Sequence, residues 1–147
     1  MKRPLFYTAL GAAAVLATIL GVAAIVSPGA GKAEAASENL AVVWTSADPD
    51  VAHRVALMYT HAAKTQEWFD EVTLIVWGPS QRLLAADKDI QEKFAEMADD
   101  GVVLQACIVC AESYGLTERL EELGLEVKGM GVPLTGHIKS GDHVITF

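Results

Sequence analysis

The sequence is poor in cysteine: among 147 residues there are two, Cys107 and Cys110. So few thiols exclude the disulfide framework that holds many small secreted domains together. They also exclude a four-cysteine zinc site, because no second Cys-x-x-Cys motif is present. The histidines are far apart in the sequence and lack the spacing of metal ligands; they are His53, His61, His137 and His143. We therefore expect neither a metal nor another cofactor.

Basic residues are also scarce, with 11 Lys and Arg against 19 Asp and Glu and a net charge of −8. Leaving out Lys2, Arg3, Lys32 and Glu34, all in the first 36 positions, leaves 8 basic and 18 acidic residues and a net charge of −10. Such an acidic surface is repelled by phosphate backbones and by anionic lipid. Nucleic acid is therefore excluded as the main partner, and we expect membrane contact only through the N-terminal segment.

Long hydrophobic runs are absent except at the N-terminus, where an Ala-rich run from Leu5 to Val26 follows Lys2 and Arg3. A polar stretch with small residues around Glu34 comes next, which is the pattern of a cleaved secretory signal. The run is also long enough to span a bilayer as a retained anchor. In either case positive charge stays inside, so the chain from about Ser37 onward is expected outside the cytoplasm, in a periplasmic or other extracytoplasmic location. We expect a signal peptide or membrane anchor over residues 1–36 and one domain over 37–147.

Short apolar runs alternate with helical patterns along the rest of the chain. The runs at 39–46, 71–78, 101–106, 125–130 and 143–147 predict five strands. Asp48 and Asp87 are placed to cap helices, the first with an inner stripe of Val51, Val55, Met58 and Ala62 and the second with Ile90, Phe94 and Met97. Gly101 and Gly115 are expected to end helices, a further helix is expected to start at Thr117, and 131–142 is expected to be turn-rich.

This alternation indicates an α/β sandwich with a mainly parallel five-stranded sheet. Parallel sheets bind and react at the carboxyl ends of their strands. The loops 45–48, 78–82, 106–110 and 131–135 are expected to share that rim, and the cysteines lie on it.

Cys107 falls where a strand passes into a helix, a place that favours the thiolate and lowers a cysteine pKa, and we expect its sulfur to be reachable from solvent. Cys110 lies one helical turn further on the same face, near enough for a disulfide after a small adjustment. Two other interpretations stay open. Either cysteine can be a buried small hydrophobe, and the two can form a permanent structural disulfide that closes a very small loop.

The segment Trp77-Gly78-Pro79-Ser80 predicts a tight turn that aims Ser80 and backbone N–H groups at the rim, where Gly78, Pro79, Ser80 and Thr135 would contact a substrate. A Gly-Pro turn that only starts a short helix explains the same letters equally well. His53 and His61 are expected to be ordinary surface histidines.

The segments "VTLIVWGPSQRLLAAD", "GVVLQACIVCAESYG" and "GVPLTGHIKSGDHVITF" resemble the DsrE/DsrF-like proteins, which include the YchN type. The resemblance covers residues 39–147, and its most specific part is a strand-end cysteine eight residues before a glycine, here Cys107 and Gly115. It implies a flavodoxin-like three-layer α/β/α fold and assembly into trimers or hexamers. It also implies that Cys107 carries sulfur as a persulfide between a donor and an acceptor protein. Where the best-known members have arginines before the glycine, this chain has Ser113-Tyr114.

Three hypotheses follow. In the first, the chain is an exported sulfur carrier or sulfurtransferase with Cys107 as nucleophile and Cys110 as resolving thiol. In the second, the pair cycles between dithiol and disulfide in a redox protein or sensor. In the third, the oligomer is a non-enzymatic binding module with inert cysteines.

Overall fold

A computed structural model describes residues 38–147, which belong to one compact unit, Glu34–Phe147. The predicted signal peptide or anchor over residues 1–36 lies outside the described residues. Within residues 38–147, no helix is long and apolar enough to cross a bilayer.

The described chain forms a five-stranded sheet in which every neighbouring pair is parallel. The strand order is β4-β3-β2-β1-β5. The strands are β1 (Leu40–Trp44), β2 (Val72–Val76), β3 (Val103–Cys107), β4 (Glu126–Lys128) and β5 (His143–Thr146). The predicted α/β fold with five strands is thereby confirmed, and the sheet is parallel throughout.

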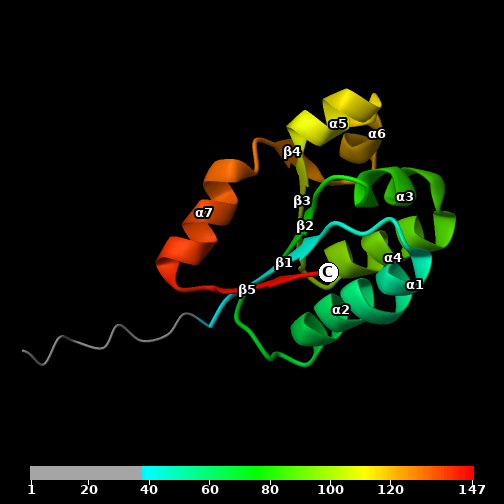
Figure 1. Cartoon of the computed structure of the whole chain (residues 1–147). Coiled ribbons are helices and arrows are strands. Elements are labelled where there is room, and N and C mark those ends of the chain that lie inside the picture. The colour runs from blue at the N-terminus through cyan, green and yellow to red at the C-terminus, as the bar shows by residue number, and fades with distance from the viewer. Residues whose placement is uncertain (1–37) are drawn as a thin grey trace, which may run out of the picture. The chain divides into compact units, whose positions relative to one another are not determined.

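Helical segments connect consecutive strands (Figure 1). They are α1 (Pro49–Val51), η1 (Ala52–Ala56), α2 (Leu57–Thr65), α3 (Ser80–Ala86), α4 (Lys88–Asp99), α5 (Ile108–Tyr114), α6 (Thr117–Glu122) and α7 (Gly131–Ser140). The first three form one continuous stretch whose middle turn, η1, is a π-helix.

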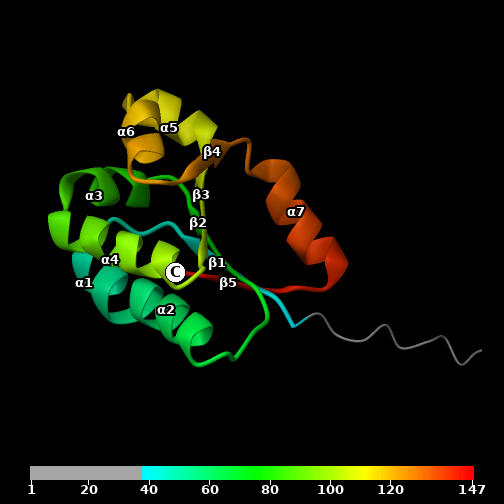
Figure 2. The ribbon, with the colours of Figure 1, turned by 180° about the vertical axis from the view of Figure 1, so that it is seen from behind.

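The handedness of the crossovers decides which face each helix covers. From β1 to β4 the chain moves across the sheet in one direction, so right-handed crossovers put α1 to α6 on one face. The step from β4 back to β5 runs in the opposite direction, and the same rule sends α7 to the other face. Figures 1 and 2 show α7 alone on its side of the sheet, opposite all the other helices. The three layers are therefore unequal.

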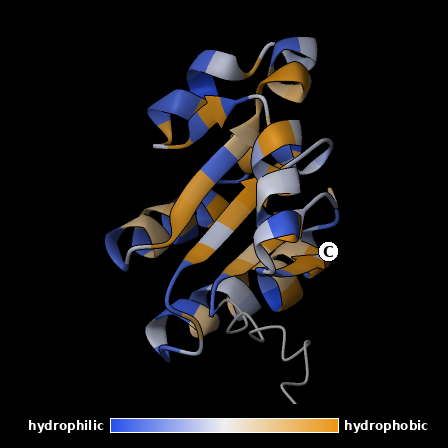
Figure 3. Cartoon of the chain, turned by 90° about the vertical axis from the view of Figure 1, so that its left-hand side faces the viewer, coloured by the Kyte–Doolittle hydropathy of each residue, from blue (hydrophilic) through white to orange (hydrophobic). Residues whose placement is uncertain are grey.

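The larger part of the core lies between the sheet and the α1–α6 layer. Alternate residues of β1, β2 and β3 point into it, and Trp44 meets Phe94 of α4 with ring centroids 6.0 Å apart. A smaller cluster lies on the α7 side and contains Ala41, Val43, Ile75, Cys107 and Met130. Figure 3 shows this pattern as hydrophobic colour along the central strands and mixed colour on the helices. Because β1 and β2 are buried on both faces, their sequences are apolar almost without interruption.

Most of the predicted helix ends are confirmed. Asp48 caps α1, with Oδ1 accepting from the Asp50 and Val51 N–H groups, and Asp87 caps α4 by accepting from Ile90. Gly115 ends α5 in the left-handed region at φ 65°, a conformation that costs glycine little.

The predicted inner face of the first helix was wrong. Met58 is 59% exposed and Val55 is exposed too, whereas Leu57 is 1% exposed and Ala52 and Ala56 are fully buried. Small alanines let this helix approach the sheet closely, and the wide π turn rotates the residues that follow it. Periodicity alone assumed a regular helix and so selected the wrong residues.

The prediction of a turn-rich segment over 131–142 was also wrong, because α7 occupies most of it. Pro133 lies in the first turn of that helix, where its missing N–H removes no intrahelical bond. Gly136 lowers helix propensity but does not prevent the helix, and Gly141 ends it at φ 83°.

Candidate functional site: the thiol pair at the carboxyl ends of β3 and β4

The site lies where neighbouring strands send their connections to opposite faces. The loop after β3 leads into α5 on one face, and the loop after β4 leads into α7 on the other (Figure 1). A parallel sheet opens a crevice at such a switch point. Cys107 is the last residue of β3 and Lys128 the last of β4, and the two are register partners. The predicted placement of the cysteines on the rim is confirmed.

Cys107 is buried, at 4% exposure, which differs from the expectation of a thiol that solvent reaches directly. Its side chain belongs to the α7-side cluster with Ile75 and Met130, and half-buried Leu134 of α7 packs against the same cluster. The cause is α7, which packs against this end of β3 through Leu134 and occupies the segment that was predicted to be turn-rich. The backbone position is as predicted, since Cys107 is the N-cap residue of α5.

Cys110 is the more accessible sulfur of the pair, half-buried one turn along α5. Both thiols are free. Partial burial raises the pKa of Cys110, while a backbone hydrogen bond from Gly78 acts in the opposite direction. A hydrogen bond with the Cys107 thiol and the repulsion of negative charge on Cys107 raise the Cys110 pKa further. The Cys107 thiol therefore lies close enough to Cys110 to affect its ionisation.

Gly78 is the predicted rim residue that does contact the thiols. It follows β2, is buried, and has φ 72°, so the left-handed turn needs a residue without a Cβ. The turn aims the Gly78 N–H at the Cys110 sulfur and places the half-buried ring of Trp77 against the Cys107 cluster.

The other predicted contact residues lie elsewhere. Ser80 is fully buried, and its hydroxyl donates to the Trp44 carbonyl at 2.6 Å, so it supports the end of β1 and does not face the rim. Pro79 is exposed at the start of α3, and Thr135 is exposed on α7 with its hydroxyl donating to Gly131 of its own helix. The structure brings Gly78, Cys107 and Cys110 together, and leaves Pro79, Ser80 and Thr135 out of that contact.

Gln81 follows Ser80 and is likewise fully buried. Its Nε2 donates to the Val76 carbonyl at 3.1 Å and to the Cys107 carbonyl at 2.9 Å. These carbonyls end β2 and β3, so one amide joins the two strands beneath the thiols. Its Oε1 has no hydrogen-bond partner among residues 38–147. Burying such an acceptor costs about 1–3 kcal/mol.

Charged groups lie beside the thiols on β4. Lys128 Nζ donates to Glu126 Oε2 at 2.6 Å, and Gln105 Nε2 donates to the same oxygen at 3.0 Å. The Lys128 hydrogen bond is the main reason that the pKa of Glu126 lies below its usual value, and the charge of Lys128 and the Gln105 bond act in the same direction. The carboxylate thus holds the ammonium group near the end of β4.

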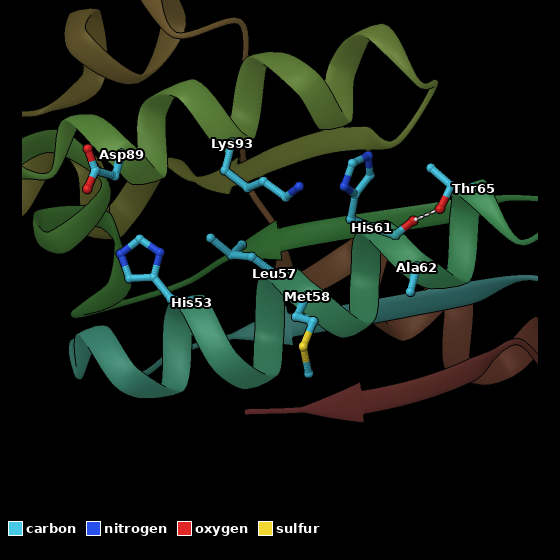
Figure 4. Close-up of a pocket in the computed structure, with 8 residues that line it drawn as sticks. All are labelled: His53, Leu57, Met58, His61, Ala62, Thr65, Asp89 and Lys93. Atoms are coloured by element: carbon cyan, nitrogen blue, oxygen red, sulfur yellow. Dashed lines mark hydrogen bonds between the residues drawn. The ribbon is translucent and has the colours of Figure 1, made fainter.

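A separate groove of about 430 Å³ lies in the α1–α6 layer, between α2 and α4 (Figure 4). His53 is 3.6 Å from Asp87 at the start of α4, and His61 is 2.5 Å from Asp100 at its end. Both histidines tie the two helices together and take no part in the thiol site. The groove is lined by His53, Leu57, Met58, His61, Ala62, Thr65, Asp89 and Lys93. Among residues 38–147, no three His, Cys, Asp or Glu side chains gather closely enough to hold a metal ion.

Comparison with known proteins identifies the family and the fold of the chain. The DsrE/DsrF-like family matches residues 22–147. The chain belongs to the DsrE/DsrF-like family. A conserved protein of unknown function from Bacteroides thetaiotaomicron has the same fold, with 31% sequence identity and a TM-score of 0.72 over 75% of this chain and 95% of that chain. No curated protein matches the chain. Family membership indicates a sulfur-transfer-related function for this DsrE-like chain.

Three residues of the site in this DsrE-like protein were not identified from the sequence. Gln81 and Met130 gave no local signal, since a helical glutamine and a methionine in an apolar run are common and only the fold brings them to Cys107. Lys128 is different, because it ends a predicted strand and such ends share one rim. A register between the third and fourth strands would have placed it beside Cys107.

Proposed function

We propose that this DsrE-like protein carries sulfur on the Cys107–Cys110 pair. Cys107 is the persulfide carrier, and Cys110 is the thiol that takes sulfur from donors in solution. The observation that supports the proposal is the interaction between a buried and a half-buried thiol one helical turn apart at a strand-end rim. A buried carrier is shielded from reductants, and the outer thiol gives it a route to donors.

In the loading step, the Cys110 thiolate attacks the terminal sulfur of a persulfide or polysulfide donor. The donor S–S bond breaks, the donor leaves as a thiolate, and Cys110 holds a persulfide. The Cys107 thiolate then attacks that terminal sulfur, which leaves a persulfide on Cys107 and a thiolate on Cys110. No electrons are lost or gained in either exchange.

Two release routes balance chemically. An acceptor thiolate can take the terminal sulfur from Cys107 and restore the Cys107 thiolate without net redox change. Alternatively the Cys110 thiolate attacks the inner sulfur of Cys107, which forms the Cys107–Cys110 disulfide and expels hydrosulfide. This second route consumes a dithiol reductant in each cycle. In the second route Cys110 is the resolving thiol.

Mass spectrometry of the reduced protein after polysulfide treatment tests the carrier role. The expected result is one added sulfur atom in the unaltered protein, assigned to Cys107 by fragmentation of the peptide that holds both cysteines, and slower addition in Cys110→Ser. Cys107→Ser is expected to retain sulfur only on Cys110, in a form that an added thiol removes quickly. The absence of added sulfur on Cys107 in the reduced protein would refute the carrier role.

The contact between the two thiols also favours a second candidate, a thiol–disulfide redox protein. In that function the pair cycles between dithiol and disulfide without bound sulfur. Equilibration of the couple with glutathione separates the two candidates, because a redox protein needs a potential near that of its thiol pool. Absence of the disulfide in air would exclude the redox function and leave the first release route intact.

We further propose that the protein acts outside the cytoplasm and as a homo-oligomer. Export is supported by the basic start and apolar run of residues 1–26, and N-terminal sequencing of the protein from a cell envelope fraction tests it. Oligomer formation is supported by the exposed apolar side chains of Val109, Val132 and Ile138. Light scattering on the purified chain is expected to give a trimer or hexamer, and a monomer at micromolar concentration would contradict it.

A further inference from the structure

Gln81 and Ser80 are consecutive residues at the start of α3, and together they hold the ends of three adjacent strands. Ser80 bonds the last carbonyl of β1, and the Gln81 amide bonds the last carbonyls of β2 and β3. Since each N–H of the amide has a carbonyl acceptor, both donors of Gln81 are used within the sheet rim. Its oxygen faces away from these carbonyls and has no partner among the described residues.

The two strand ends joined by Gln81 carry the two halves of the thiol site. The end of β2 leads directly into Trp77 and Gly78, whose N–H contacts the Cys110 sulfur. The end of β3 is Cys107 itself, from which α5 carries Cys110. One side chain therefore bridges the Gly78 turn and the start of α5, beyond the last paired residues of β2 and β3.

A second link between these elements lies further from the sulfurs. The Arg82 guanidinium of α3 stacks on the Tyr114 ring of α5, with its carbon 4.9 Å from the ring centroid. This contact is at the exposed end of α5 and holds the helices together without touching the thiols. Gln81 acts at the buried end, where the geometry of the Gly78 N–H and the Cys110 sulfur is determined.

We propose that Gln81 is a positioning residue that aligns the Gly78 N–H with the Cys110 sulfur by fixing the ends of β2 and β3 to each other. The inference deepens the proposed function, because it concerns the thiol that exchanges with donors. It applies to any chemistry of Cys110, since alkylation needs the same thiolate as sulfur exchange.

The test compares Gln81→Met with Gln91→Met. Methionine keeps the length of the side chain and removes both donors. Gln91 is the matched control, because its Nε2 also donates to two backbone carbonyls, those of Leu84 and Ala85, at the far end of α3. The measurement is the rate of iodoacetamide alkylation of Cys110 as a function of pH, assigned by tandem mass spectrometry of the peptide that holds both cysteines, with melting temperature recorded for each variant.

In Gln81→Met the Gly78 turn at the end of β2 is expected to move away from α5, so the Cys110 thiolate loses the hydrogen bond from the Gly78 N–H. The midpoint of the alkylation profile is expected to move to higher pH, and the rate at pH 7 is expected to be about three- to tenfold lower than in the unaltered protein. The limiting rate at high pH is expected to stay the same. Gln91→Met is expected to melt lower while keeping the profile of the unaltered protein. Should Gln81→Met not fold, Gln81→Asn keeps the amide on a side chain one methylene shorter and is expected to show a smaller displacement in the same direction.

An unchanged profile in a folded Gln81 variant, or an equal displacement in Gln91→Met, would show that Gln81 has only a structural role. This outcome is independent of sulfur loading. If polysulfide adds no sulfur to the unaltered protein while the Gln81 profile is displaced, the carrier function fails and the positioning role stands.

Discussion

Cys107 and Lys128 are register partners at the carboxyl ends of β3 and β4, so their side chains leave the same face of the sheet. Neighbouring strands are about 4.8 Å apart, so Lys128 is the neighbour of Cys107 across the sheet, with its ammonium group bonded to Glu126 Oε2. This end of the sheet thus combines two sulfurs with the Lys128–Glu126 ion pair, in a chain whose net charge is −8. An anionic sulfur donor approaching this rim is repelled by the acidic surface, and Lys128 reduces that repulsion by offsetting the charge of Glu126.

Removing that cation is expected to slow reactions with anionic donors. In Lys128→Met, sulfur loading from polysulfide anions should be about two- to fivefold slower at low salt, and the difference should shrink as salt screens the charge. The measurement is the loading rate against ionic strength. Lys139→Met, which removes an exposed cation from α7, is the control and should load at the rate of the unaltered protein. Equal slowing with the neutral reagent iodoacetamide would point to altered structure instead of lost charge.

The contact between the sulfurs predicts how Cys110 responds to its neighbour. Burial raises the pKa of Cys110, and the Cys107 thiol raises it further through a hydrogen bond and through its charge when ionised. In Cys107→Ala both contributions of Cys107 disappear, so the pKa of Cys110 should fall. A lower pKa gives more thiolate at neutral pH, and alkylation of Cys110 at pH 7 should be faster than in the unaltered protein. If the alkylation profile of Cys110 in Cys107→Ala has its midpoint at the same pH as in the unaltered protein, or at a higher pH, the two thiols do not interact as described.

Ser80 was expected at the rim and instead supports the core. Ser80→Ala removes one donor to the Trp44 carbonyl and should lower the free energy of unfolding by about 0.5–1.5 kcal/mol, because this buried acceptor loses a hydrogen bond and keeps only the Trp77 N–H at 3.0 Å. Sulfur loading of the folded fraction should not change. Ser113→Ala is the control, since its exposed hydroxyl bonds the Cys110 carbonyl and should matter by less than about 0.5 kcal/mol. If Ser80→Ala loses sulfur loading while its free energy of unfolding is unchanged, Ser80 contacts the substrate at the rim, as the sequence predicted.

Local patterns predicted most of the fold. Short stretches of sequence are enough to predict the five strands, the helix caps at Asp48 and Asp87, and the glycines that end helices. Each of these features depends on neighbours within a few residues. The carboxyl-end rim followed from the parallel sheet, and with it the position of Cys107. Its burial did not follow, because it depends on α7 returning across the opposite face from residues more than twenty positions later. That helix was not predicted because it contains Pro133 and Gly136, residue types that are typical of turns.

The first helix shows the same limit for packing. Its spacing was interpreted as a regular helix, while the π turn and the small alanines moved Leu57 to the inside and Met58 to the outside. Leu57→Ala is expected to cost about 2–5 kcal/mol of unfolding free energy. Met58→Ala should stay within about 0.5 kcal/mol. Chemical denaturation of both variants checks the assignment, and a larger cost at Met58 would support the sequence-based stripe.

Access to Cys107 depends on how α7 covers it. No residue of α7 is fully buried, and the helix meets the Cys107 cluster through half-buried Leu134. Leu134→Ala removes most of that cover, so alkylation of Cys107 at a fixed pH should be faster by about threefold or more as its burial decreases. Ile138→Ala is the matched control, since Ile138 is 61% exposed and outside the cluster, and it should leave the rate unchanged. Both cysteines lie between Lys93 and Arg119 on one tryptic peptide, so fragmentation of that peptide by tandem mass spectrometry separates Cys107 from Cys110. If Leu134→Ala alkylates only Cys110, then Met130 and the sheet seal Cys107 without help from α7, and donors would have to reach it through Cys110 alone.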